Sequence, residues 1–198
     1  MENIYQRLLS GVDTFYFGVE FEGLNEDQPN PYEKFLQNWQ DTLNWYKKQA
    51  QDGKQAILKI GEQSFEVKKS GRENYQWILQ NRDFSLALSS VYSESYPQVY
   101  VELRSNFILS VGLERAVDLV CSFISDWIYP PARIIASRLD LFIDVAGYPF
   151  DREDIPNFLC RAKFRIKTGK SVKTQTYYRQ REITGFAFGR GLARGSRV

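Results

Sequence analysis

The sequence contains no histidine, and this absence removes whole classes of catalytic and metal site. Ser-His-Asp and Cys-His catalysis both need an imidazole as the base, so neither is available to this chain. A metal site would also have to be built without histidine ligands. Oxygen donors are then the main alternative, and they favour Mg²⁺ or Mn²⁺.

Cysteine is scarce as well, and long apolar runs are lacking. Cys121 and Cys160 are too few for a disulfide framework, which favours a reducing cytoplasm. No apolar run approaches the roughly 18–20 residues of a membrane span. Met1–Leu9 has no basic segment followed by an apolar one, so no signal peptide is expected. We therefore expect a cytoplasmic protein without membrane association, and the lack of a GxxxxGK[ST] motif argues against nucleotide hydrolysis.

The residues that are present suit a packed domain with an uneven charge distribution. A chain of 198 residues with 43% hydrophobic and 15% aromatic content predicts a single domain, 1–198. Arg161–Val198 holds eleven of the 26 Lys/Arg and one of the 24 Asp/Glu, so this part carries about +10 and the rest about −8. Aromatic residues are interleaved with these basic residues: Tyr177, Tyr178, Phe186 and Phe188. This combination suits a polyanion with bases to stack on, and the alternative is a solvated basic surface.

Periodicity predicts many short strands and few helices. The predicted strands are Val12–Glu22, Ala56–Ile60, Ser64–Lys68, Tyr75–Gln80, Phe84–Ser89, Val99–Arg104 and Ile134–Val145, followed by a hairpin of Lys173–Arg181 and Thr184–Gly189. The predicted helices are Tyr32–Gln51, Gly112–Ile128 and Asp151–Cys160.

This pattern predicts an α+β fold, an antiparallel sheet with the helices packed on one face. Residues 1–90 form a strand, helix and meander part, and residues 91–198 form a core that bears the motifs described below. The helix Gly112–Ile128 with its two flanking strands resembles one β-α-β half of a ferredoxin-like arrangement.

The strand Arg138–Val145 carries the most informative pattern. Alternation sends Leu139, Leu141, Ile143 and Val145 toward the helices and Arg138, Asp140, Phe142 and Asp144 to the other face. Acids are disfavoured in strands, and such exceptions tend to mark functional positions. Asp140 and Asp144 lie about 13 Å apart along an extended strand, so one ion cannot bind both directly unless the strand bends. The alternative is an exposed face with an Arg138–Asp140 ion pair.

Glu102 falls in a similar pattern, because Tyr100, Glu102 and Arg104 alternate with apolar residues. If this strand pairs next to Ile134–Val145, Glu102 joins Asp140. Two or three oxygen ligands with waters and a phosphate are the usual way to hold Mg²⁺. The candidate metal ligands are therefore Asp140, Glu102 and Asp144, and the alternative for Glu102 is a plain cross-strand pair with an arginine.

The end of the chain, Ile183–Val198, is rich in glycine and arginine. Glycine permits close approach of the backbone to phosphate, and arginine offers forked donors to it. The candidate DNA-binding residues are Arg138, Lys173, Arg179, Arg181, Arg190, Arg194 and Arg197. The alternative for the segment is a frayed basic tail.

The strand Arg138–Asp144 resembles the R-[IL]-D-[LV]-x-x-D strand of the replication initiation factor family. That family includes rolling-circle initiators of plasmids and their relatives on conjugative transposons and phages. Its second motif is an aromatic-x-G-x-R-x-S-like turn followed by R-[IV]-Y-[ND]-K. Phe186–Arg190 resembles the first half of this motif, and Arg197-Val198 resembles the opening of the second half. The resemblance covers roughly Val99 to the end.

The resemblance implies a DNA-nicking endonuclease whose tyrosine attacks a phosphodiester, with acids that support a divalent metal. It implies a replication or transfer origin as substrate, and a host helicase and a second copy of the chain as partners. The tyrosine would come immediately after Val198, so the chain as given is expected to bind DNA without nicking it. Two alternatives remain: a non-catalytic DNA-binding or regulatory protein of a mobile element or phage, and a basic α+β phage protein of unrelated function.

Overall fold

The computed structural model describes residues 6–22, 30–146, 175–179 and 182–187, with side chains for 9–22 and 30–143. The chain divides into two compact units. The larger unit is Leu8–Asp144, and the other combines Met1–Arg7 with Val145–Val198.

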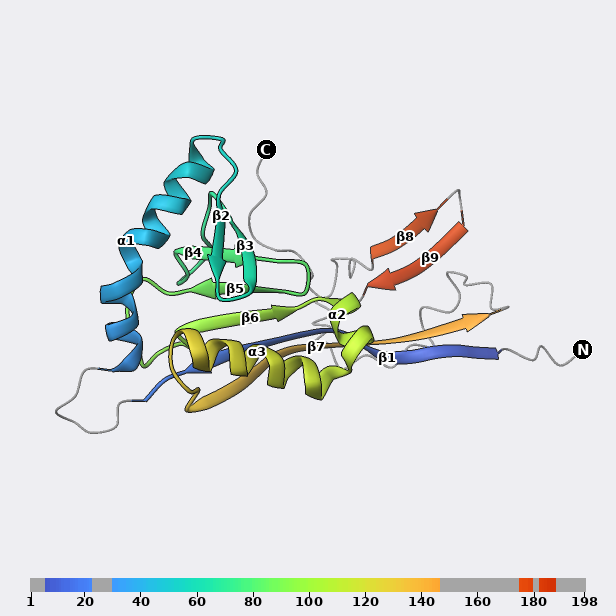
Figure 1. The fold of residues 1–198 in the computed structure, drawn as a ribbon. Coiled ribbons are helices and arrows are strands. Elements are labelled where there is room, and N and C mark those ends of the chain that lie inside the picture. Colours follow the sequence, from blue (N-terminus) through green and yellow to red (C-terminus); the bar gives the residue numbers. More distant parts are fainter. Residues whose placement is uncertain (1–5, 23–29, 147–174, 180–181, 188–198) are drawn as a thin grey trace, which may run out of the picture. The chain divides into compact units, whose positions relative to one another are not determined.

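Figure 1 shows the elements of both units. Seven strands form one sheet in the order β2-β3-β4-β5-β6-β1-β7. Their bounds are β1 Gln6–Glu20, β2 Ile57–Ile60, β3 Gln63–Val67, β4 Trp77–Gln80, β5 Phe84–Leu88, β6 Val99–Leu103 and β7 Arg133–Ala146. The helices of the described residues are α1 Pro31–Gln51, α2 Ser105–Val111 and α3 Leu113–Trp127. The hairpin consists of β8 Gln175–Arg179 and β9 Glu182–Ala187, which pair antiparallel as predicted.

The central position of β1 defines the topology of the sheet. On one side β1 pairs antiparallel with β6, so that Phe17 lies opposite Val101. On the other side β1 lies next to β7. Just before β7 begins, the N–H of Ala132 donates a hydrogen bond to the Glu20 carbonyl at 2.9 Å. The strands β6 and β7 lie on either side of β1, and the chain between them forms α2 and α3. In the same way, β1 and β5 lie on either side of β6, and the chain between them includes α1. These interleaved units confirm the predicted α+β fold with ferredoxin-like elements.

The hydrophobic core lies between one face of the sheet and the helices. The helix α1 begins at Pro31 behind Asn30, whose side chain accepts a hydrogen bond from the N–H of Tyr32 at 2.8 Å. Aromatic rings join the layers. Trp127 of α3 meets Phe35 of α1 at 5.0 Å between ring centroids, and Phe123 of α3 meets Phe65 of β3 at 5.4 Å. The helices thus cover the middle of the sheet from one side.

The apolar side chains of β7 are not covered in the way that the sequence predicts. Leu139, Leu141 and Ile143 are 52%, 72% and 63% exposed, and the side chain of Val145 lies outside the described residues. The prediction that the helices cover this strip is therefore wrong for the three described residues. The physical reason is the position of β7, which is the last strand of the sheet beyond β1. The aromatic contacts of α3 are made with β3 and β5, so this helix packs over other strands.

Other differences from the predicted elements are small. The strand predicted from Val12 begins at Gln6, and the helix predicted from Gly112 begins at Leu113. Gly112, with φ of 84°, separates it from the short α2, which the sequence did not predict. The strands on either side of residue 90, β5 and β6, pair along five residues and so belong to one sheet. The predicted helix Asp151–Cys160 lies outside the described residues.

Among the described helices, none combines the length and the apolar character needed to cross a membrane.

Candidate functional site

The candidate site lies on the face of the sheet that the described helices, α1, α2 and α3, leave uncovered. Side chains alternate along each strand, so Tyr16 lies opposite Glu102 on this face while Phe15 and Phe17 turn to the core. The neighbouring strand β7 adds Arg138 beside them, as its contact with Tyr16 shows. Three strands that are far apart in sequence thus bring aromatic and charged side chains together.

Tyr16 is the centre of this group. Its ring meets the Tyr100 ring edge-on at 6.2 Å between centroids, and the Arg138 guanidinium carbon lies 5.2 Å from the Tyr16 ring centroid. Burial raises the pKa of Tyr16; Glu102 and Asp140 add to the rise, and Arg138 opposes it. Two of the three candidate metal ligands, Glu102 and Asp140, therefore act on the same tyrosine.

Asp140 is held by the arginine two residues before it. The Arg138 Nε donates to the two carboxylate oxygens at 3.1 and 2.9 Å, and Nη2 donates to Oδ2 at 2.5 Å. The hydrogen bond to Asp140 raises the pKa of Arg138. The ion pair that the sequence left as an alternative is therefore present.

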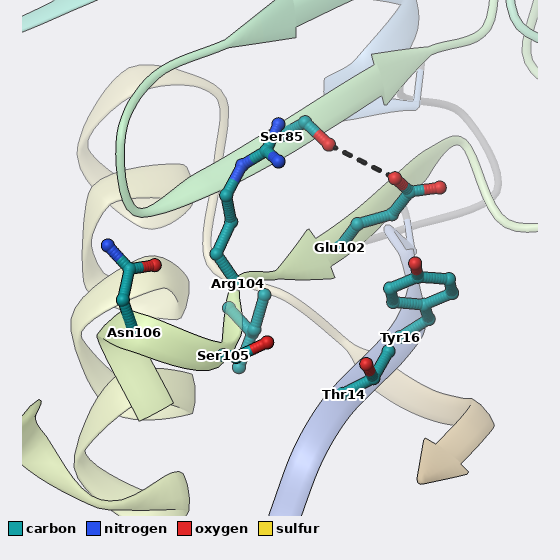
Figure 2. Close-up of a pocket in the computed structure, with 8 residues that line it drawn as sticks. Thr14, Tyr16, Ser85, Glu102, Arg104, Ser105 and Asn106 are labelled. Atoms are coloured by element: carbon teal, nitrogen blue, oxygen red, sulfur yellow. Dashed lines mark hydrogen bonds between the residues drawn. The ribbon is translucent and has the colours of Figure 1, made fainter. Parts of the chain in front are cut away.

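Glu102 is held by Arg72, a residue that the sequence did not single out. The Arg72 Nη1 donates to Glu102 Oε1, and the Ser85 hydroxyl donates to Oε2 at 3.3 Å (Figure 2). The Arg72 guanidinium carbon also lies 4.5 Å from the Tyr100 ring centroid. Glu102 is thus paired across the sheet face with an arginine, although not with its strand neighbour Arg104.

A tight turn places Arg72 over the sheet. Arg72 and Tyr75 exchange two backbone hydrogen bonds of 2.9 Å, and Asn74 between them has a φ of 64°. Asn tolerates this left-handed conformation better than most residues. Gly71 is required because a Cβ there would lie 2.4 Å from the Tyr75 carbonyl oxygen. The Gly-Arg-Glu-Asn-Tyr segment was the available sequence signal, but it does not reveal which strand the turn approaches.

Next to Tyr16 the surface forms an open hollow of about 380 Å³. Figure 2 shows the Tyr16 hydroxyl directed toward Glu102 and the Arg104 side chain reaching toward Ser85. The hollow is lined by Thr14, Tyr16, Ser85, Glu102, Leu103, Arg104, Ser105 and Asn106. Within the part of the chain that the structure describes, Arg104 takes part in no ion pair. The hydroxyl, amide and guanidinium groups in this lining suit an oxyanion. The carboxylate of the lining, Glu102, is compensated by its pair with Arg72.

The predicted metal ligands are brought near one another only in part. The premise that β6 pairs next to β7 is wrong, because β1 lies between them and separates their backbones by two strand spacings, roughly 10 Å. Among residues 9–22 and 30–143 no group of three or more His, Cys, Asp or Glu side chains could hold a metal ion. Asp144 lies in β7, but its side chain is outside the described residues.

Glu102 and Asp140 therefore do not form a closed cage of carboxylates by themselves. Proteins also hold Mg²⁺ more loosely, by one or two carboxylates together with waters and a substrate phosphate. Glu102 or Asp140 would each supply one such carboxylate, after exchange of its arginine partner.

The predicted DNA-binding residues are distributed over both units. Arg138 lies on the uncovered sheet face. Arg179 lies in β8, together with Tyr177 and Tyr178, and its side chain is outside the described residues. The remaining candidates also lie outside them: Lys173, Arg181, Arg190, Arg194 and Arg197.

Comparisons of the chain with protein-family models, curated proteins and solved structures find no match.

Proposed function

We propose that the chain is the DNA-binding scaffold of a rolling-circle replication initiator, an endonuclease that nicks an origin through a tyrosine with the help of Mg²⁺ or Mn²⁺. The observation that carries the proposal is the pair of carboxylates, Glu102 and Asp140, that flank Tyr16 on the uncovered sheet face. The proposal places the protein in the cytoplasm, with a plasmid, phage or transposon origin as its DNA. A host helicase and a second copy of the chain are its proposed partners.

The chemistry of this face supports the proposal. Two acids on neighbouring parts of a sheet would repel each other without counter-charges, and Arg72 and Arg138 provide these. Exposed ion pairs of this kind contribute only about 0–1 kcal/mol, so exchange of a carboxylate from arginine to a metal ion and phosphate costs little. A divalent ion at such a carboxylate would polarise a scissile phosphate.

Tyr16 itself is a poor candidate for the nucleophile. Its pKa is raised by burial and by the two acids, so its hydroxyl resists the deprotonation that an attacking oxygen needs.

The proposal is tested with protein expressed from the complete gene and supercoiled origin DNA in the presence of Mg²⁺ or Mn²⁺. Nicking is expected, and Asp140→Ala is expected to abolish it because the face loses one of its two acids. Asp126→Ala, which removes an exposed acid from α3, is the matched control and should nick normally. Normal nicking by Asp140→Ala would remove Asp140 from the proposed site.

One observation favours a second function, a non-catalytic DNA-binding or regulatory protein. Both carboxylates are already neutralised by arginines, as in a face built only for binding. The same experiment separates the two functions, since this second protein binds origin DNA in a salt-dependent manner but leaves it supercoiled.

A further inference from the structure

On the uncovered sheet face, arginine guanidinium groups lie over tyrosine rings. The Arg72 guanidinium carbon lies 4.5 Å from the centroid of Tyr100, and that of Arg138 lies 5.2 Å from the centroid of Tyr16. Both rings are half-buried, and they stand on the adjacent strands β1 and β6 with 6.2 Å between their centroids. Aromatic rings and guanidinium planes are the two kinds of protein surface on which unpaired nucleobases stack.

Among the described residues, the ion pairs of this face leave the Arg104 side chain without an acidic partner. Arg72 is compensated by Glu102 and Arg138 by Asp140. Arg104, in the hollow beside Tyr16, has no acidic partner within the described ranges. A phosphate would therefore be drawn to Arg104, where hydroxyl and amide groups add further hydrogen-bond donors.

We infer that this face binds single-stranded DNA, with bases stacked on the layers at Tyr16 and Tyr100 and a phosphate in the hollow at Arg104. The inference rests on the proposed function, which supplies DNA as the ligand, and it adds the form of the DNA and the contacts that hold it. A single strand is required because the bases of a duplex are paired and stacked on one another. A sheet whose aromatic side chains stack two or three bases is a recurrent way to bind single strands.

Contacts within the face hold both rings in place. The Tyr16 ring packs edge-on against the Tyr100 ring, and the Arg138 guanidinium lies over it. The Tyr100 hydroxyl is hydrogen-bonded to Ser137 Oγ at 2.6 Å, which fixes the ring relative to β7. The two rings are thus positioned before any base arrives.

The stacking contacts are tested by titrating a fluorescein-labelled oligo(dT) with the full chain at several salt concentrations. Tyr16→Leu and Tyr100→Leu are each expected to weaken binding about tenfold, or about 1.4 kcal/mol, without changing the salt dependence. Tyr16→Phe and Tyr100→Phe keep the ring and are expected to retain most of the affinity. Trp45→Leu removes an exposed aromatic ring from α1 and serves as the matched control, with unchanged affinity.

The phosphate contact has a different signature. Arg104→Gln is expected to reduce the slope of log affinity against log salt by about 0.7, the value for one phosphate contact on a single strand. A duplex of the same sequence is expected to show no loss of affinity with either leucine variant.

Wild-type protein provides an independent measurement if a leucine variant fails to fold. Photo-cross-linking to an oligonucleotide that carries 5-iodouracil is expected to yield peptides containing Tyr16 or Tyr100. Cross-links confined to the basic residues 161–198 would overturn the inference.

The outcomes also distinguish this inference from the proposed function. Oligo(dT) binding that is unaffected by both leucine variants overturns the stacking contacts and leaves DNA binding intact. Tighter binding of oligo(rU) than of oligo(dT) overturns DNA as the occupant. A wild-type chain that binds neither duplex nor single-stranded DNA would sink the proposed function itself.

Discussion

Two tyrosine hydroxyls in the larger unit are held where ionisation is unfavourable. Tyr32 donates to the Ser89 carbonyl at 2.7 Å, and Tyr75 donates to the Pro97 carbonyl at 3.0 Å. Burial raises the pKa of Tyr75 to about 12 and that of Tyr32 well above its usual value. The folded state therefore favours the protonated form of both tyrosine hydroxyls.

This linkage predicts that the protein loses stability in alkaline solution. An unfolded tyrosine ionises near pH 10, so the contribution of Tyr75 is complete below pH 10 and is lost as the pH rises from about 10 to 12. Urea unfolding at pH 8, 10 and 11 should show a falling free energy of unfolding. Tyr75→Phe should make the fall shallower, and an unchanged pH dependence in this variant would contradict the assignment.

Two indoles of the core, the buried Trp77 and the half-buried Trp127, offer a second test at the scale of single residues. The Trp77 Nε1 donates to Asn44 Oδ1 at 3.0 Å, whereas the buried Trp127 Nε1 has no hydrogen-bond partner among the described residues. Trp77→Phe removes a hydrogen bond and takes one donor away from the Asn44 side-chain oxygen. Trp127→Phe removes a buried N–H that has no described acceptor. We expect Trp77→Phe to be the more destabilising by about 1–2 kcal/mol in chemical denaturation. Equal losses would mean that Trp127 has a partner in solution.

At the scale of elements, periodicity in the sequence was a reliable guide to helices and strands. The apolar stripe of α1 and the alternation around Phe17 each follow from local chemistry, and the structure confirms both. What alternation cannot supply is the identity of the neighbouring element. Alternation placed Asp140 and Leu141 on opposite faces of β7, but it could not tell which of the two faces other elements would cover.

The candidate site shows the same limit. Glu102 and Asp140 were recognisable because acids are unusual in strands, and the alternation that exposes them is local. Arg72 was missed because its contact with Glu102 joins residues 30 positions apart, through a turn whose direction no nearby residue reveals. The insertion of β1 between β6 and β7 is likewise a property of topology.

The exposed strip of β7 leads to a direct prediction. Leu141 is 72% exposed and Leu86 is fully buried in β5. Leu141→Ala should change the free energy of unfolding by no more than about 0.5 kcal/mol, whereas Leu86→Ala should cost about 2–5 kcal/mol. A loss of about 2 kcal/mol or more for Leu141→Ala in urea unfolding would show that the strip is covered in solution.

At the scale of the larger unit, β1 holds the two parts of the sheet together. It is the partner of both β6 and β7, which begin about 80 and about 110 residues after β1 ends. A defect in β1 should therefore weaken the whole unit rather than one end of it.

Gly18 is the position at which to test this. A Cβ there would lie 2.3 Å from the Cγ of Pro97, whose ring has little freedom to move. Gly18→Ala is expected to cost about 1–3 kcal/mol and to lower the urea midpoint without changing the slope of the transition. Gly11→Ala on the same strand meets only the tip of Phe142, at 3.2 Å, and should cost less. Separate transitions by fluorescence and circular dichroism would contradict a cooperative unit.

The place of β7 at the end of the sheet also has a consequence for how the protein behaves in concentrated solution. This strand has 14 residues, and within the described part of the chain it has a neighbour on one side only. The other edge therefore presents a row of backbone donors and acceptors that no described strand pairs with. Leucine and isoleucine side chains project beside that row. Long apolar edges of this type recruit strands from other molecules, so aggregation of this protein should begin along β7 and should be suppressed by a lysine at Leu141.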